Sequence, residues 1–217
     1  MKKKRARSIE AKGILFNNII SNGRALFLEQ GSRGFSMRAL AQSLNLTQGA
    51  LYTYVKSKRE LWFAIVSENL KVFEDQVKSL RDSNENNNID LIEKIILLFF
   101  ENIKTDPRLF QIMFTTSPPP AQRKGPIEEN FTVNTINILE EILIESIKKK
   151  EIRIKDPSAT ALYLWSLIFG NAMLSNTDIF GLRDNLFGKK TNLEYYNFVL
   201  EQIREYTDSL KRRRFYR

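Results

Sequence analysis

Hydrophobic residues recur along this chain at alternating steps of three and four, which is the spacing of one face of an α-helix. In the first segment the repeating positions are Ile9, Gly13, Phe16, Ile20, Gly23 and Phe27. They predict a helix over about residues 8–30. The same pattern predicts further helices over about 37–44, 48–55, 58–77, 90–104, 107–117, 127–150, 158–175 and 193–212. No segment alternates as a strand would, so the sequence predicts an all-α fold of about nine helices.

Polar residues, glycine and proline mark the boundaries of these segments. Ser36 and Thr47 each precede a short apolar repeat and are expected to cap a helix. Ser57 and Glu60 have the spacing of a capping box, and Asp90 is expected to cap a later helix. Loops are expected at 82–88, in the Pro-rich stretch 118–126, and at 176–191, where Asn, Asp and Gly are frequent.

Two short helices separated by a turn of about three residues have helix-turn-helix spacing. Leu40, Leu44, Leu46 and Leu51 are expected to form the wedge between them. Gln48 at the start of the second helix can reach a base edge. The hydroxyls of Tyr52 and Tyr54, the methyl of Thr53 and the ammonium of Lys58 offer phosphate or base contacts. Each residue alone is equally compatible with packing or a solvated surface, so the argument rests on their joint spacing.

The positive charge of the chain is concentrated at its start. Residues 1–60 hold 12 Lys and Arg against 3 Asp and Glu, whereas the remaining residues hold 22 of each kind. A basic module attached to a larger body suggests a polyanionic partner, since cations near phosphates release counterions. Alternatives for the basic stretch 2–7 are a solvated face or tail, and an anionic membrane is a second candidate polyanion.

The segment GFSMRALAQSLNLTQGALYTYVKSKREL, residues 34–61, resembles the DNA-binding domain of TetR-family transcriptional regulators. Val55 stands where phenylalanine is usual in the family, and Asn45 where glycine is common. The resemblance implies a DNA-binding domain over 1–62 and a ligand-binding, dimer-forming domain over 63–217. The expected DNA-binding residues are Ser36, Arg38, Thr47, Gln48, Gly49, Ala50, Tyr52, Thr53, Tyr54 and Lys58.

Beyond residue 62 the resemblance is one of architecture. The stretch ALYLWSLIFG, residues 161–170, is similar to a body-helix pattern of the family, with Phe169 in place of a frequent histidine. The family's interface implies a homodimer through the helices near 158–175 and 193–212. The first of these is apolar on most faces, so it is buried in a partner or is the central core helix of a monomer.

Aromatic and methionine side chains on the later helices suggest a pocket for a small apolar effector. The candidates are Phe99, Phe100, Phe110, Met113, Phe114, Phe131, Trp165 and Phe169. Ordinary core packing is the alternative for each of them.

Composition narrows the function further. The chain has no Cys and no His, which removes thiol nucleophiles, Ser-His-Asp triads and most zinc sites. We therefore expect no enzyme, no cofactor and no metal, and, without a signal peptide or an apolar stretch of membrane-spanning length, a cytoplasmic protein with no membrane partner. The expected function is a repressor that binds a palindromic double-stranded operator and is released by an effector. The alternatives are an architectural DNA-binding protein and an all-α carrier or enzyme.

Overall fold

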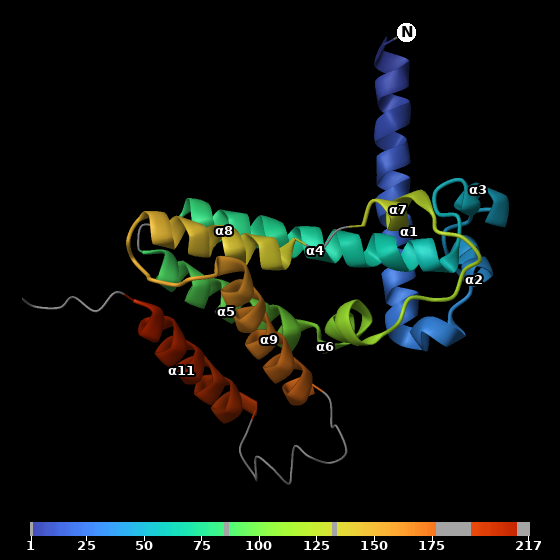
Figure 1. Cartoon of the computed structure of the whole chain (residues 1–217). Helices are drawn as coiled ribbons and strands as arrows, with labels where there is room; N and C mark the ends of the chain where they lie inside the picture. Colours follow the sequence, from blue (N-terminus) through green and yellow to red (C-terminus); the bar gives the residue numbers. More distant parts are fainter. Residues whose placement is uncertain (1, 85–86, 132–133, 177–191, 212–217) are drawn as a thin grey trace, which may run out of the picture. The chain divides into compact units, whose positions relative to one another are not determined.

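The computed structural model describes residues 2–84, 87–131, 134–176 and 192–211. The helices in chain order are α1 (Lys2–Gly34), α2 (Met37–Ser43), α3 (Gln48–Tyr52), α4 (Lys58–Asp82), α5 (Asn88–Thr105), α6 (Pro107–Phe110), the π-helix η1 (Gln111–Thr115), α7 (Pro126–Glu129), α8 (Thr135–Lys148), α9 (Pro157–Asn176) and α11 (Asn192–Leu210) (Figure 1). These residues form no strand beyond one antiparallel bridge between Ile152 and Lys211. The all-α prediction is confirmed.

The first helix is longer than its apolar repeat predicts. It begins at Lys2, so the basic stretch 2–7 continues the helix at its N-terminal end. Gly31 interrupts it with φ 70° and ψ 172°, close to the predicted end, and one further turn follows to Gly34. A positive φ of this size is readily adopted by glycine, which explains the residue at this kink.

Three further boundaries differ from the prediction. The helix expected over 48–55 ends at Tyr52. The cap of α5 is Asn87, whose side-chain oxygen accepts the N–H of Asp90 at 3.0 Å, so Asp90 lies inside the first turn. The single helix expected over 127–150 is two helices, α7 and α8. Phe131, in the segment between them, packs against the aromatic ring of Phe63, with ring centroids 5.0 Å apart.

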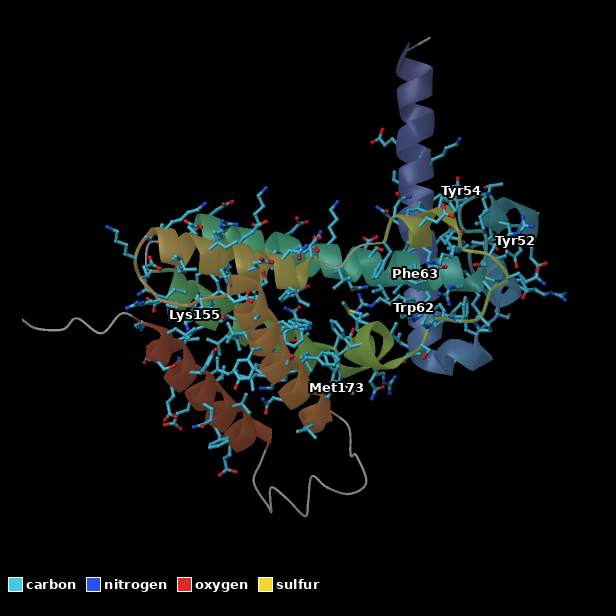
Figure 2. All side chains as sticks on the ribbon, viewed as in Figure 1. Tyr52, Tyr54, Trp62, Phe63, Lys155 and Met173 are labelled. Carbon is cyan, nitrogen blue, oxygen red and sulfur yellow. The ribbon has the colours of Figure 1, made fainter. Side chains whose placement is uncertain are left out.

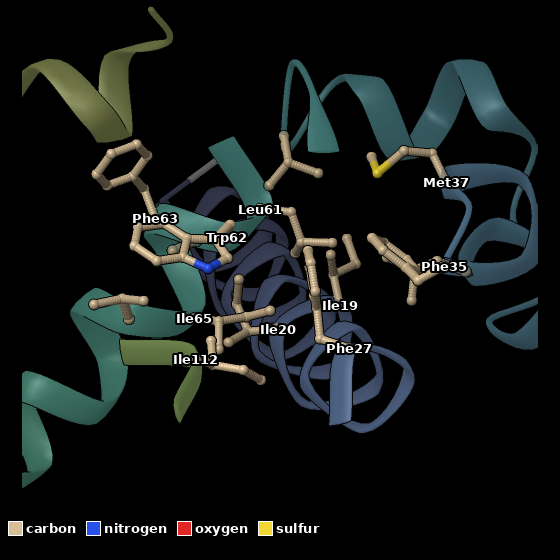
Figure 3. Packing of buried hydrophobic residues seen from close by; sticks show 14 of the residues in the cluster. Ile19, Ile20, Phe27, Phe35, Met37, Leu61, Trp62, Phe63, Ile65 and Ile112 are labelled. Carbon is tan, nitrogen blue, oxygen red and sulfur yellow. The ribbon is translucent and has the colours of Figure 1, made fainter. Parts of the chain in front are cut away.

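The chain divides into two compact units. Unit 1 contains Met1–Val72 and Arg108–Thr132, and unit 2 contains Phe73–Pro107 and Val133–Arg217. The core of unit 1 joins α1, α2, α3, the first part of α4 and η1 around Phe27, Phe35, Leu61 and Ile112 (Figure 3). The helix α4 is continuous across the division, so it belongs to both units. The predicted domain boundary at residue 62 also falls inside this helix.

Unit 2 is built around α5, which packs against α8, α9 and α11. Glu151 fixes the start of α5 because its carboxylate accepts the N–H of Asn88 at 3.0 Å. Arg204 of α11 and Glu93 of α5 form a salt bridge of 3.0 Å. No helix among the described residues has both the length and the apolar character needed to cross a lipid bilayer.

Candidate DNA-binding surface

Two side-chain caps fix the start of α2 and α3. The Ser36 hydroxyl oxygen accepts the N–H of Ala39 at 3.1 Å, and the Thr47 hydroxyl oxygen accepts the N–H of Ala50 at 3.1 Å. Both predicted caps are confirmed. Each satisfies a backbone donor that the first helical turn would otherwise leave unpaired.

The turn between α2 and α3 depends on a left-handed residue. Asn45 has a φ of 54°, and the N–H groups of Leu44 and Leu46 both donate to the carbonyl oxygen of Ala41. Asparagine tolerates this conformation better than most residues after glycine. The asparagine that replaces the family's common glycine therefore preserves the turn.

The wedge beneath the turn is buried as its residues predict. Leu40, Ala41 and Leu51 are 0–1% exposed, and Leu44 and Leu46 are partly buried against the same core. Each fully buried leucine contributes about 1.5–3 kcal/mol relative to an exposed one. The two short helices are therefore held by the core of unit 1, since helices of seven and five residues are not stable alone.

The structure leaves most of the predicted DNA-binding side chains at the surface of unit 1. Tyr52 is 40% exposed, and Tyr54 is partly buried against the core (Figure 2). The other exposed positions are Ser36, Arg38, Thr47, Gln48, Gly49 and Thr53, while Ala50 and Lys58 are half-buried. A short helix with a free outer face is therefore presented on a fixed base.

Two side chains that follow α3 donate hydrogen bonds to carbonyl oxygens of its last turn. The Thr53 hydroxyl donates to the carbonyl oxygen of Ala50 at 2.7 Å, and the Lys56 ammonium donates to the carbonyl oxygen of Tyr52 at 3.1 Å. With its hydroxyl engaged, Thr53 offers chiefly its methyl group to a ligand.

Lys58 is positioned by an aromatic ring. Its Nζ lies 5.0 Å from the ring centroid of Phe35, within the range of a cation–π interaction. Partial burial lowers the pKa of the Lys58 ammonium from its usual value. The ring holds this cation at the start of α4, next to the turn that follows α3.

Glu60 does not complete the predicted capping box. The Ser57 hydroxyl oxygen accepts the N–H of Glu60 at 3.0 Å, which confirms half of it. The Glu60 carboxylate, which is 1% exposed, instead accepts the N–H of Lys56 and, at 3.2 Å, the N–H of Ile127. The capping-box spacing is a local signal, but Ile127, one of the two donors to Glu60, lies 67 residues along the chain.

A partly buried ion pair lies beside Glu60. Arg59 donates from Nε to Glu128 Oε2 at 2.8 Å and from Nη2 to Oε1 at 2.6 Å. Its Nη1 donates to the carbonyl oxygen of Pro119 at 3.3 Å. Sequence reasoning missed this pair, since nothing local connects residues so far apart.

The Arg59–Glu128 pair predicts an acid-sensitive contribution to the stability of unit 1. Hydrogen bonds from Arg59 hold the pKa of Glu128 below its usual value of 4.5. The unfolded chain therefore binds more protons as the pH falls, and the contribution, present above pH 4.5, is lost through the folded pKa. Urea unfolding at pH 7 and at pH 3.5–4.5, followed by Trp62 fluorescence in a Trp165→Phe background, should show a steeper acid loss than in Glu128→Gln. Equal losses in both proteins would contradict the assignment.

The predicted pocket residues divide between the two units. Phe99, Phe100, Trp165 and Phe169 belong to unit 2, where Phe99 and Trp165 have ring centroids 5.3 Å apart and Trp165 stacks with Phe169 at 6.1 Å. Phe110, Met113, Phe114 and Phe131 belong to unit 1, and the last three pack against its core. An open cleft of about 210 Å³ in unit 1 is lined by Phe27, Leu28, Gly31, Arg108, Gln111, Ile112 and Thr116, none of them a predicted pocket residue.

Comparison with known proteins identifies the unit that carries this surface. Residues 19–65, from α1 into α4, match the sequence profile of the family described as bacterial regulatory proteins, tetR family. Residues 19–65 are therefore similar to the N-terminal domain of TetR-family regulators. The HTH-type transcriptional regulator Rv1816 of Mycobacterium tuberculosis is 35% identical over 74 residues, which are 34% of this chain and 29% of that regulator. The chain thus matches less than a third of the length of this relative.

Solved structures of transcriptional regulators share the fold of most of the chain. The transcriptional regulator FadR from Bacillus subtilis, solved in complex with stearoyl-CoA, is 20% identical with a TM-score of 0.62 over 87% of this chain and 97% of that one. AibR, solved in complex with isovaleryl coenzyme A and operator DNA, is 18% identical with a TM-score of 0.57 over 86% and 96%. At these identities the likeness is one of fold.

Proposed function

We propose that this protein is a homodimeric, sequence-specific DNA-binding regulator that represses transcription until a small apolar effector releases it. The observation that carries this proposal is the exposed outer face of α3, which is capped by Thr47 and anchored by the buried Leu51. A short helix presented in this way fits the major groove.

Base reading is assigned to the start of α3. Gln48 is exposed there, and a glutamine amide suits the hydrogen-bonding edge of adenine. Gly49 and the half-buried Ala50 have small side chains, which lets the helix approach the groove wall. Tyr52, Tyr54 and Lys58 are assigned to phosphates, contacts that position the protein without reading sequence.

Dimerisation is supported by exposed apolar side chains on two packed helices. Leu162 and Tyr163 of α9 are 54% and 49% exposed, and Phe198 of α11 is 51% exposed. The helices contact each other (Figure 1). The rings of Tyr163 and Tyr206 lie 5.1 Å apart. A second copy would cover this face, and two copies would read the two halves of a palindrome.

The effector is proposed to be an apolar acyl group. FadR and AibR, which share the fold, were solved with acyl thioesters of coenzyme A, and these are the compounds to screen first. In this chain the aromatic cluster of Phe99, Trp165 and Phe169 offers an apolar wall in unit 2. An acyl chain is a suitable ligand for such a wall.

Release requires that the effector favour a state that does not fit the operator. The helix α4 runs without a break from unit 1 into unit 2, so a shift of this helix can change the spacing of the two α3 helices. Only one spacing fits both half-sites. An effector that binds the other spacing more tightly by a few kcal/mol is sufficient.

Substitutions on α3 and α4 test the assignment of these roles. We expect Gln48→Ala to weaken the cognate site by about 1–3 kcal/mol and other sequences little, whereas Lys58→Ala weakens all sequences and lowers the salt slope by about 1. Tyr54→Ala should weaken all sequences, and Tyr54→Phe shows how much of that loss belongs to the hydroxyl. The measurement is fluorescence anisotropy on a selected duplex and a scrambled duplex, with Lys78→Ala, an exposed residue of α4, as the control. Wild-type affinity in all three alanine variants would overturn the assignment.

A further inference from the structure

A loop outside the helix-turn-helix is fastened beside it within unit 1. The Arg59 guanidinium bonds the carbonyl oxygen of Pro119 and the carboxylate of Glu128. One side chain at the start of α4 therefore holds Pro119, at the start of the loop 119–125, and Glu128 of α7, just beyond its end. The loop runs from η1 to α7 and passes the turn between α3 and α4 (Figure 1).

The end of this loop next to α7 is held by Glu60. Gly125 packs so closely on its carboxylate that a Cβ added there would lie 2.5 Å from Glu60 Cδ. The same carboxylate accepts the N–H of Ile127 and the N–H of Lys56. The main chain of the loop and the main chain just after α3 are therefore held by the two oxygens of one side chain.

Two cations lie in this loop, directly before the glycine that packs on Glu60. Arg123 and Lys124 directly precede Gly125, and both are exposed. Within the described part of the chain, neither makes a hydrogen bond or a salt bridge. Lys124 is close enough to Glu128 to help lower the pKa of that carboxyl, whose charge Arg59 already engages. The N–H of Lys56 donates to the same Glu60 carboxylate, and Lys58 at the start of α4 lies over the ring of Phe35.

We infer that the loop 119–125 is a second DNA-contacting element, in which Arg123 and Lys124 bind backbone phosphates flanking the site that α3 reads. The partner is duplex DNA, and the contact is independent of sequence because the loop offers point charges rather than a base-reading pattern. The hydrogen bonds of Arg59 and Glu60 hold the loop in position before DNA binds, which reduces the entropy lost on binding. The inference rests on the proposed function.

The double variant Arg123→Gln/Lys124→Gln tests it. The probe is a fluorescein-labelled 30-base-pair duplex of scrambled sequence, and anisotropy is measured across a salt series. Loss of two phosphate contacts should reduce the slope of log affinity against log salt by about 2 for each bound protomer, and the affinity at 0.1 M salt by about 10- to 100-fold for each bound protomer. An unchanged slope would overturn the inference.

Two control variants make the outcome specific. Arg123→Lys/Lys124→Arg keeps both charges in the loop and should keep the wild-type slope. Lys104→Gln/Lys155→Gln removes two exposed charges from unit 2, where Figure 2 labels Lys155, and should leave the slope unchanged. An equal loss in this control would show an effect of net charge alone and would also overturn the inference. If the wild type itself fails to bind the duplex, the proposed function fails. If the wild type binds and Arg123→Gln/Lys124→Gln has the same salt slope, only the loop inference fails.

Discussion

Glu60→Ala is expected to lower the free energy of unfolding of unit 1 by about 2–6 kcal/mol. The Glu60 carboxylate is 1% exposed and accepts the N–H groups of Lys56 and Ile127. Its removal leaves two backbone donors without an acceptor, and each costs about 1–3 kcal/mol when buried. The substitution also removes the carboxylate against which Gly125 packs, so the loop 119–125 loses this contact.

The measurement can be confined to unit 1 because the chain has two tryptophans, one in each unit. In a Trp165→Phe background, Trp62, which packs edge-to-face on Phe63 with ring centroids 4.9 Å apart, is the remaining indole (Figure 3). Urea unfolding followed by its fluorescence then gives the stability of unit 1. Glu68→Ala, an exposed position on the same helix, is the matched control and should change it by less than about 0.5 kcal/mol. A Glu60→Ala protein as stable as this control would contradict the role of Glu60 in stabilising unit 1.

A charge in the exposed apolar face of unit 2 is expected to abolish the dimer. Leu162→Glu/Phe198→Glu places carboxylates on α9 and α11 where a second copy is proposed to pack. A carboxylate buried in an apolar interface without a partner is strongly unfavourable. Because the second half-site binds as an intramolecular event in the dimer, its loss should reduce operator affinity by about 100-fold or more.

Sedimentation equilibrium gives the oligomeric state, and anisotropy on the selected operator gives the affinity. Val72→Glu is the control, since this residue of α4 is 51% exposed and apolar but lies in unit 1. It should leave a dimer with wild-type affinity. If Leu162→Glu/Phe198→Glu stays a dimer, the interface lies elsewhere.

The helix-turn-helix was predictable because its signals are local. Ser36 and Thr47 cap the helices that follow them, and the apolar repeat places Leu40 and Leu51 in the core, as the structure confirms. Asn45 was noted as a departure from the family pattern, and its φ of 54° explains why it is tolerated. Each of these features depends on residues fewer than about ten positions apart.

Features that depend on distant residues were not predictable in the same way. The segment 127–150 has a continuous helical pattern, but it divides at Phe131, whose ring packs on Phe63 within unit 1 while α8 lies in unit 2. The capping-box spacing of Ser57 and Glu60 gave no indication that the carboxylate binds the N–H of Ile127. The set of pocket residues was chosen by type, and the fold distributes it between two units. Their role in effector binding, like the DNA contacts of α3, stays a prediction.

The most direct test of the central claim is footprinting with the wild-type protein on the DNA upstream of its own gene, across a salt series. We expect one protected palindrome, with half-sites about one helical turn apart, whose protection declines steeply with salt and weakens for Gln48→Ala. Uniform coverage without a preferred site would contradict sequence-specific regulation and favour an architectural DNA-binding protein. An absence of binding even at low salt would contradict the DNA-binding function of α3 altogether.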